Sequence, residues 1–168
     1  MKRTNKLPLY TARGAIIAAL YITLTLLASI LGLSNGVIQL RISEAMCILP
    51  LFLPEAVPGL FVGCLISNLL VPGAVIWDII FGSLATLLGA IGARAMKGLP
   101  EKYKWMATIP TILANMIIVP LVLIYAYGED GAYWFFMTTV GIGEIVCAGF
   151  GGGALYYLLR KYKRIWLK

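Results

Sequence analysis

Six long apolar stretches, separated by short connections that are polar or contain proline, dominate the chain. They run over residues 12–33, 43–53, 57–71, 75–96, 105–127 and 133–159. A helix that crosses a bilayer needs about 20 predominantly apolar residues. We therefore predict six transmembrane helices. The stretches 43–53 and 57–71 are shorter than a full crossing, so the pattern defines their limits least well.

The composition agrees with a membrane protein. Of the 168 residues, 61% are hydrophobic and only 12% are charged, and the mean hydropathy is +0.91. A soluble domain of this length needs more polar surface than that. The first apolar stretch is also longer than the core of a signal peptide, so we expect it to remain in the protein. We predict an all-α integral membrane bundle that forms a single domain over residues 1–168.

Basic residues cluster in three places that a six-helix topology puts on one side of the membrane. The clusters are Lys2, Arg3, Lys6 and Arg13; Arg94, Lys97, Lys102 and Lys104; and Arg160, Lys161, Lys163, Arg164 and Lys168. Because basic loops remain in the cytoplasm, we predict that both termini are cytoplasmic. We also expect the membrane to be the plasma membrane. The net charge of +7 then reports topology, and a nucleic-acid partner is not needed to explain it.

Several polar side chains interrupt the apolar pattern, and most fall on the opposite, outward side. A charge at mid-membrane costs about 2.5–3.5 kcal/mol on insertion scales, so such groups are expected to face a polar cavity or each other. Amides, carboxylates, one guanidinium and an indole together suit a small, flat, polar ligand. We predict that the substrate-binding residues are Gln39, Arg41, Glu44, Asn68, Trp77, Asp78, Asn115 and Glu144.

Purely structural roles compete with this interpretation for three residues. Arg41 and Glu44 have the spacing of a helix-start ion pair, and Ser43 suits an N-cap. Asn115 suits an interhelical hydrogen bond worth about 0.6 kcal/mol. Glu144 has no basic residue nearby in the sequence, so a structural pairing explains it less well.

Small residues recur at helical spacing in the first stretch. Gly14 pairs with Ala18, and Ala15 pairs with Ala19, four residues apart. Small residues let helix backbones approach closely, either within the bundle or against a partner protein. The pattern alone does not separate these two uses.

Several chemistries find no support in the sequence. There is no histidine, no P-loop motif and no zinc-protease motif. Cys47, Cys64 and Cys147 lie in apolar stretches without metal-ligand or disulfide spacing, so they are expected to be small core residues. We predict no enzymatic activity, no metal and no cofactor.

Five segments resemble the QueT family of queuosine-precursor transporters. They are "GAIIAALYITLTLL" from residue 14, "GVIQLRISEAMCILPLF" from 36, "GLFVGCLISNLL" from 59, "WDIIFGSLATLLGA" from 77 and "VGIGEIVCAGFGGGALYYLL" from 140. The likeness covers nearly the whole chain, from about residue 12 to 159. It is weak at 95–105 and 129–133.

The resemblance implies the substrate-binding (S) component of an energy-coupling-factor (ECF) importer. Such a six-helix protein captures its cargo outside and delivers it inward together with a membrane coupling protein and two ATPases. The implied cargo is a 7-deazaguanine: queuine, preQ1 or preQ0. Small residues on the first helix contact the coupling protein in that family type, which implies an interface at Gly14, Ala15, Ala18 and Ala19. The acid that accepts hydrogen bonds from the guanine-like edge is not decided: Glu44, Asp78 and Glu144 are all candidates.

Two other functions remain compatible with the sequence. One is an S component for another vitamin or for a nucleobase. The other is a proton-coupled secondary transporter with Glu144 or Asp78 as the relay, although such carriers usually contain repeats that are not visible here.

Overall fold

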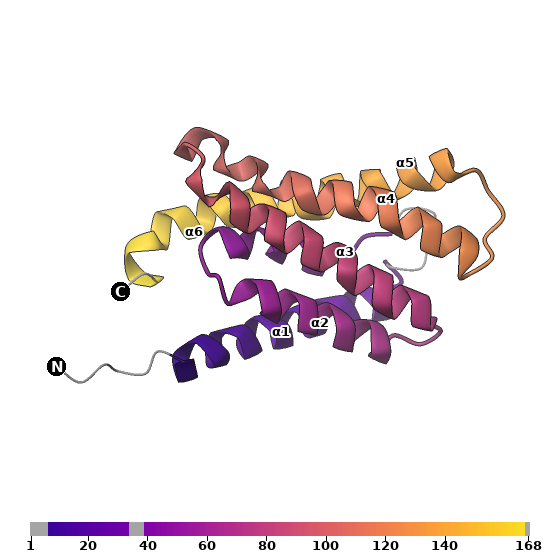
Figure 1. The fold of residues 1–168 in the computed structure, drawn as a ribbon, viewed down its shortest axis with the longest axis horizontal. Coiled ribbons are helices and arrows are strands. Elements are labelled where there is room, and N and C mark those ends of the chain that lie inside the picture. Colours follow the sequence, from indigo (N-terminus) through magenta and orange to yellow (C-terminus); the bar gives the residue numbers. More distant parts are fainter. Residues whose placement is uncertain (1–6, 34–38, 167–168) are drawn as a thin grey trace.

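The computed structural model describes residues 7–33 and 39–166, which form helices packed side by side (Figure 1). No strand occurs in this part of the chain, so the predicted all-α class is confirmed. Lys2, Arg3, Lys6 and Lys168, and the first part of the motif at residues 36–38, lie outside the described residues. The helical elements are α1 Leu7–Ile30, η1 Ile42–Leu51, α2 Ala56–Leu70, α3 Ile76–Ala95, η2 Met96–Gly98, η3 Glu101–Thr108, α4 Ile109–Tyr125, α5 Tyr133–Glu144, η4 Ile145–Gly151 and α6 Gly152–Trp166.

Four helical segments of the described chain are long and apolar enough to cross a membrane. They are Leu7–Ile30, Ile76–Gly98, Glu101–Tyr125 and Tyr133–Tyr162. The shorter elements η1 and α2 occupy the two stretches whose limits the pattern defined least well. A topology with six crossings therefore remains a prediction.

The two ends of the bundle differ in which connections they carry (Figure 1). The start of α1, the end of α6 and the connection between α3 and α4 lie at one end. The α2–α3 and α4–α5 connections lie at the other end. The basic residues Arg94, Lys97, Lys102 and Lys104 therefore share an end with the start of α1, as the charge pattern predicts.

The element η1 is a 3₁₀ helix of ten residues, although such runs rarely exceed four. It packs against α1, α3, α6 and η4, and the side chains of Met46 and Cys47 join a core with Tyr21 and Leu60. This burial offsets the poorer hydrogen-bond geometry of a long 3₁₀ segment. Since Glu44 belongs to the same element, η1 carries a carboxyl group into the core.

Glycines bring α1 and α2 into close contact. A Cβ atom at Gly59 would lie 2.7 Å from the carbonyl oxygen of Gly14. One at Gly63 would lie 3.1 Å from the Cα atom of Ala18. Gly14 and Ala18 therefore serve packing within the bundle. Ala15 and Ala19 lie on the exposed side of α1.

The last predicted stretch forms one continuous helical segment made of α5, η4 and α6. Its middle part, Ile145–Gly151, is π-helical, and Glu144 lies at the junction where the backbone widens. Insertions of π-helix into α-helices occur frequently at functional sites. The junction therefore singles out the position of Glu144 within the last helix.

Candidate functional site

A cavity of about 650 Å³ opens at the end of the bundle that carries the α2–α3 and α4–α5 connections. Its wall combines polar groups with the apolar side chains of Val119, Val122, Phe135, Phe136 and Val140. This mixture is typical of a pocket for a small molecule. The polar lining residues are Thr25, Gln39, Arg41, Asn68, Asp78, Tyr127, Glu129 and Asp130.

Arg41 is held by Asp78 in the cavity wall. Nη2 of Arg41 lies 3.7 Å from Oδ1 of Asp78, and the Tyr127 hydroxyl donates a hydrogen bond of 3.1 Å to Oδ2. Burial and the Asp78 carboxylate raise the pKa of Tyr127, so its hydroxyl remains a donor at neutral pH. The alternative in which Arg41 pairs with Glu44 is wrong.

Asn68 lies beside this group and is partly committed to structure. Its Nδ2 donates to the backbone oxygen of Asp78 at 3.4 Å. A Cβ atom at Gly82 would lie 2.9 Å from the same Nδ2 and 3.3 Å from Oδ1 of Asp78. Because Gly82 on α3 has no side chain, there is room beside it for Asn68 of α2 and for Asp78.

Glu44 lies fully buried beneath the cavity and not in its wall. Its carboxylate accepts hydrogen bonds from the Tyr21 hydroxyl, from Thr86 Oγ1 at 3.3 Å and from Cys47 Sγ at 3.0 Å. All three donors are uncharged. Ser43 is not an N-cap, because its hydroxyl instead accepts a hydrogen bond of 2.8 Å from Thr25.

Asn115 and Glu144 also lie below the cavity, but three of their four polar side-chain atoms lack a well-aligned hydrogen-bond partner among the described residues. Each residue is one helical turn from a lining residue, Val119 and Val140 respectively, on the same helix face. Both amide atoms of Asn115 and Oε2 of Glu144 are buried without a hydrogen-bond partner among the described residues. No well-aligned interhelical hydrogen bond to Asn115 forms among the described residues, although its amide lies next to the Glu144 carboxyl group on α5.

Such unpaired groups are unusual in a folded protein. Most buried polar atoms are hydrogen-bonded, and an unsatisfied one costs about 1–3 kcal/mol. Glu144 lies within electrostatic reach of Glu44 and Arg41, and close to the Asn115 amide. Two helices thus hold an amide and a carboxyl group side by side just below the residues that line a polar cavity, and three of their polar atoms have no well-aligned partner among the described residues.

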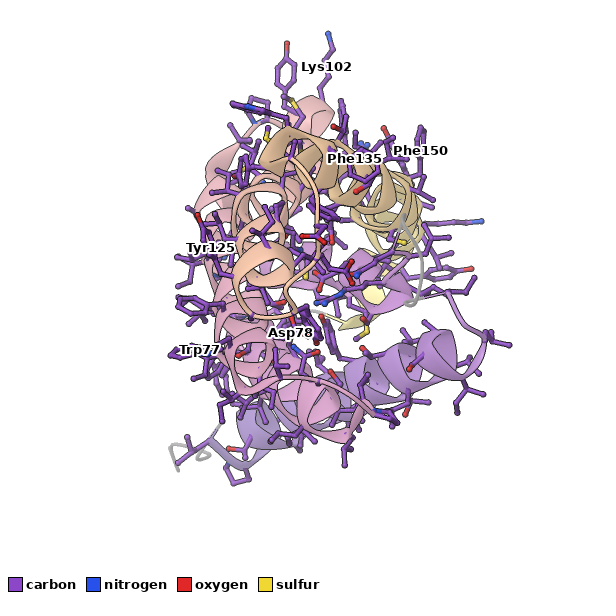
Figure 2. The ribbon with its side chains drawn as sticks, turned by 90° about the vertical axis from the view of Figure 1, so that its right-hand side faces the viewer. Trp77, Asp78, Lys102, Tyr125, Phe135 and Phe150 are labelled. Carbon is purple, nitrogen blue, oxygen red and sulfur yellow. The ribbon has the colours of Figure 1, made fainter. Side chains whose placement is uncertain are left out.

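Trp77 is the predicted site residue that the structure does not bring to the others. Its side chain is 54% exposed and stacks on Phe81 with ring centroids 6.0 Å apart. Figure 2, which faces the cavity end, shows Trp77 pointing outward and Asp78 pointing toward the middle of the bundle. Consecutive residues of an α-helix do not point to the same face, so Trp77 points away from the side that Asp78 faces.

The cavity contains polar residues that were absent from the predicted set. Tyr127, Glu129 and Asp130 belong to the α4–α5 connection, and Thr25 belongs to α1. The acidic turn next to Gly128 is visible in the sequence, but its proximity to Asp78 depends on tertiary packing. Gly128 has a φ of 70°, which favours glycine and turns the chain after α4.

Nothing in the described residues suggests a metal centre. No group of three or more His, Cys, Asp or Glu side chains is arranged there to hold an ion. Cys47, Cys64 and Cys147 are free and buried. The site is therefore described by hydrogen bonding, charge and shape.

Comparison with known proteins places the chain in a family. The sequence profile described as "QueT transporter" matches residues 11–161. The queuosine precursor transporter QueT of Lactococcus lactis subsp. cremoris (strain MG1363) is 34% identical over 107 residues. That alignment covers 62% of this chain and 60% of the relative, so the chain spans less than two thirds of the relative's length. No solved structure matches significantly.

The family match and the four apolar helices agree with the membrane character of the composition. The profile covers every described helix except the extreme ends of α1 and α6. The chain belongs to the QueT transporter family.

Proposed function

We propose that this protein is the S component of an ECF-type importer and that it captures a queuosine precursor at the outer face of the plasma membrane. The ligand class is a 7-deazaguanine: queuine, preQ1 or preQ0. In this proposal six helices cross the membrane and both termini are cytoplasmic, so that the cavity opens on the extracellular side. Family membership and the name of the L. lactis relative support the ligand class.

The observation that carries the proposal is the unsatisfied pair of Asn115 and Glu144 beneath the cavity. A guanine-like edge offers N1–H and an exocyclic amine as parallel donors, and one carboxylate accepts both. The adjacent carbonyl oxygen of the base needs a donor, which the Asn115 amide supplies. A bound base therefore gives a partner to Oε2 of Glu144 and to the amide nitrogen of Asn115, two of the three atoms of this pair that have none among the described residues.

Energy for import comes from a separate module in this proposal. The chain has no P-loop, so ATP hydrolysis belongs to two partner ATPases that act through a membrane coupling protein. The exposed pair Ala15 and Ala19 on α1 contacts that coupling protein, since small residues permit close helix approach. Gly14 and Ala18 shape this surface only indirectly, because they pack against α2.

Two alternatives keep the same cavity but change its use. An S component for another vitamin or a nucleobase has a different ligand. A proton-coupled secondary transporter needs no ATPase, and the buried Glu144 is its candidate relay. The first alternative does not account for the ligand named for the L. lactis relative, and the second differs from the proposal only in its source of energy.

Uptake measurements separate these functions. Cells that lack endogenous uptake are given this chain alone, or this chain with an ECF module, and accumulation of labelled preQ1 is followed. We expect accumulation only with the module, and loss of accumulation when the ATPase sites of the module are mutated. Uptake by the chain alone that an uncoupler abolishes would instead establish the secondary transporter.

A further inference from the structure

The two ends of the cavity differ in charge. The inner end has Asn115 and Glu144 beneath its floor. The charged residues that line the whole cavity are Arg41, Asp78, Glu129 and Asp130, which is three acids against a single base in the described wall. Arg41 is already paired with Asp78. Glu129 and Asp130 therefore leave the mouth with excess negative charge.

From this asymmetry we propose that the ligand enters with its hydrogen-bonding edge inward and a cationic arm outward, and that Glu129 and Asp130 select amine-bearing ligands over neutral ones. The inference rests on the proposed function and adds the orientation and charge of the ligand. Both residues lie outside the set of acids considered from the sequence.

Three features support this orientation. First, the unpaired atoms below the floor, on Asn115 and Glu144, need donors and an acceptor in fixed geometry, which a heterocycle edge provides and a flexible arm does not. Second, Glu44 is satisfied by three neutral donors, so it does not require the ligand's cation. Third, the acids at the mouth lie on the α4–α5 connection, where an arm of variable size meets solvent and not packed helices.

The geometry of the mouth also concentrates the effect of its charges. Gly128, with a φ of 70°, turns the chain between Tyr127 and Glu129. Tyr127 hydrogen-bonds Asp78 at 3.1 Å and so ties this connection to α3. The turn holds the acidic pair over the cavity, and low-dielectric walls strengthen the field that an incoming cation meets.

A matched pair of ligands tests the inference. PreQ1 carries an aminomethyl arm and preQ0 a nitrile on the same ring, so contacts to the ring cancel in the ratio of their dissociation constants. Purified wild-type protein is expected to bind preQ1 at least about fivefold more tightly than preQ0. The double variant Glu129→Gln/Asp130→Asn should reduce this ratio to about one by weakening preQ1 alone.

A second variant fixes the orientation. Glu144→Gln should weaken preQ1 and preQ0 by the same factor, because it acts on the shared edge. Higher ionic strength should weaken preQ1 more than preQ0, since exposed charges are screened. Equal binding of the two bases by the wild type, an unchanged ratio in the double variant, or a loss confined to preQ1 in Glu144→Gln would each overturn the inference.

If the proposed function is wrong, the binding measurements give a different result from those that overturn the inference. If the wild type binds neither base, the 7-deazaguanine assignment is wrong, and the mouth is then tested with tryptamine and tryptophol. These share a flat ring and differ in an ammonium or hydroxyl arm. Thermal stabilisation by tryptamine that disappears in the double variant supports selection of cations, and its absence in the wild type overturns it.

Discussion

At the scale of single residues, the central feature is a group of unsatisfied polar atoms just below the floor of the cavity. Glu144 is 4% exposed and Asn115 is fully buried, yet Oε2 of the one and both amide atoms of the other have no partner in the described chain. A ligand that supplies these partners recovers the free energy of about 1–3 kcal/mol per group that burial costs.

Glu144→Gln should weaken binding of a 7-deazaguanine tenfold or more, which corresponds to about 1.4 kcal/mol. The amide presents an N–H group to the ligand donors in place of a second acceptor lone pair. Isothermal titration with detergent-purified protein measures the effect.

Glu101→Gln is the matched control, because this half-exposed carboxylate lies at the start of η3, at the other end of the bundle, and pairs with Lys104 and Arg160. Its affinity should equal that of the wild type. Unchanged affinity in a folded Glu144→Gln protein would remove Glu144 from the site.

The sequence identified most polar residues of the site but not their partners. Gln39, Arg41, Asn68 and Asp78 line the cavity, as their positions at the outward ends of the apolar stretches suggested. Sequence spacing favoured pairing of Arg41 with Glu44, whereas the folded chain pairs Arg41 with Asp78. That contact joins two residues 37 positions apart in the sequence and depends on packing that no local pattern encodes.

At the scale of elements, the close approach of α1 and α2 depends on glycines. A Cβ atom at Gly63 would lie 2.9 Å from Cβ of Tyr21 and 3.1 Å from the backbone oxygen of Ala18. Because α1 also carries Tyr21, which holds Glu44, this contact supports the floor of the cavity.

Gly63→Ala should lower the thermal unfolding temperature in detergent, because the new methyl group overpacks a contact between backbones at a cost of about 1–3 kcal/mol. Gly153→Ala in α6 is the control, since a Cβ atom there meets nothing within 4 Å. The control should be neutral or stabilising, because alanine favours a helix over glycine by about 0.5–1 kcal/mol. An unfolding temperature for Gly63→Ala equal to that of the wild type would contradict the packing.

Hydrophobic periodicity located the helical elements but not their type. The stretch 43–53 was expected as a short helix and contains the 3₁₀ element η1, whereas 133–159 contains the π-helical η4. Both irregular helices make contacts with other elements that stabilise them. The helix propensities of their own residues therefore do not predict them. The pattern of small residues likewise did not show which of them face the bundle. In the structure Gly14 faces α2, whereas Ala15 is exposed.

At the scale of the whole molecule, one face of α1 is packed and the other is available to a partner. Ala15→Leu should abolish module-dependent uptake while leaving ligand affinity unchanged, because the larger side chain keeps a partner helix at a distance. Ala154→Leu, an equal enlargement at an exposed alanine of α6, is the control and should transport normally. Equal loss of binding and uptake in Ala15→Leu would show that Ala15 has an internal packing role.

The overall architecture followed from composition and charge more directly than the site did. Four described segments have the length and hydropathy of membrane crossings, and the described basic residues between α3 and α4 share an end with the start of α1. The acidic mouth formed by Glu129 and Asp130 was not predicted as part of the site, because it is assembled by a loop that the sequence places only on the outward side.

The central claim is that this cavity alone, without any ATPase, binds a 7-deazaguanine. Its most direct test is equilibrium titration of purified wild-type protein with queuine, preQ1 and preQ0, with riboflavin as the unrelated ligand. The account predicts saturable one-to-one binding of at least one 7-deazaguanine and none of riboflavin. Absence of binding by all three bases to folded protein would contradict it.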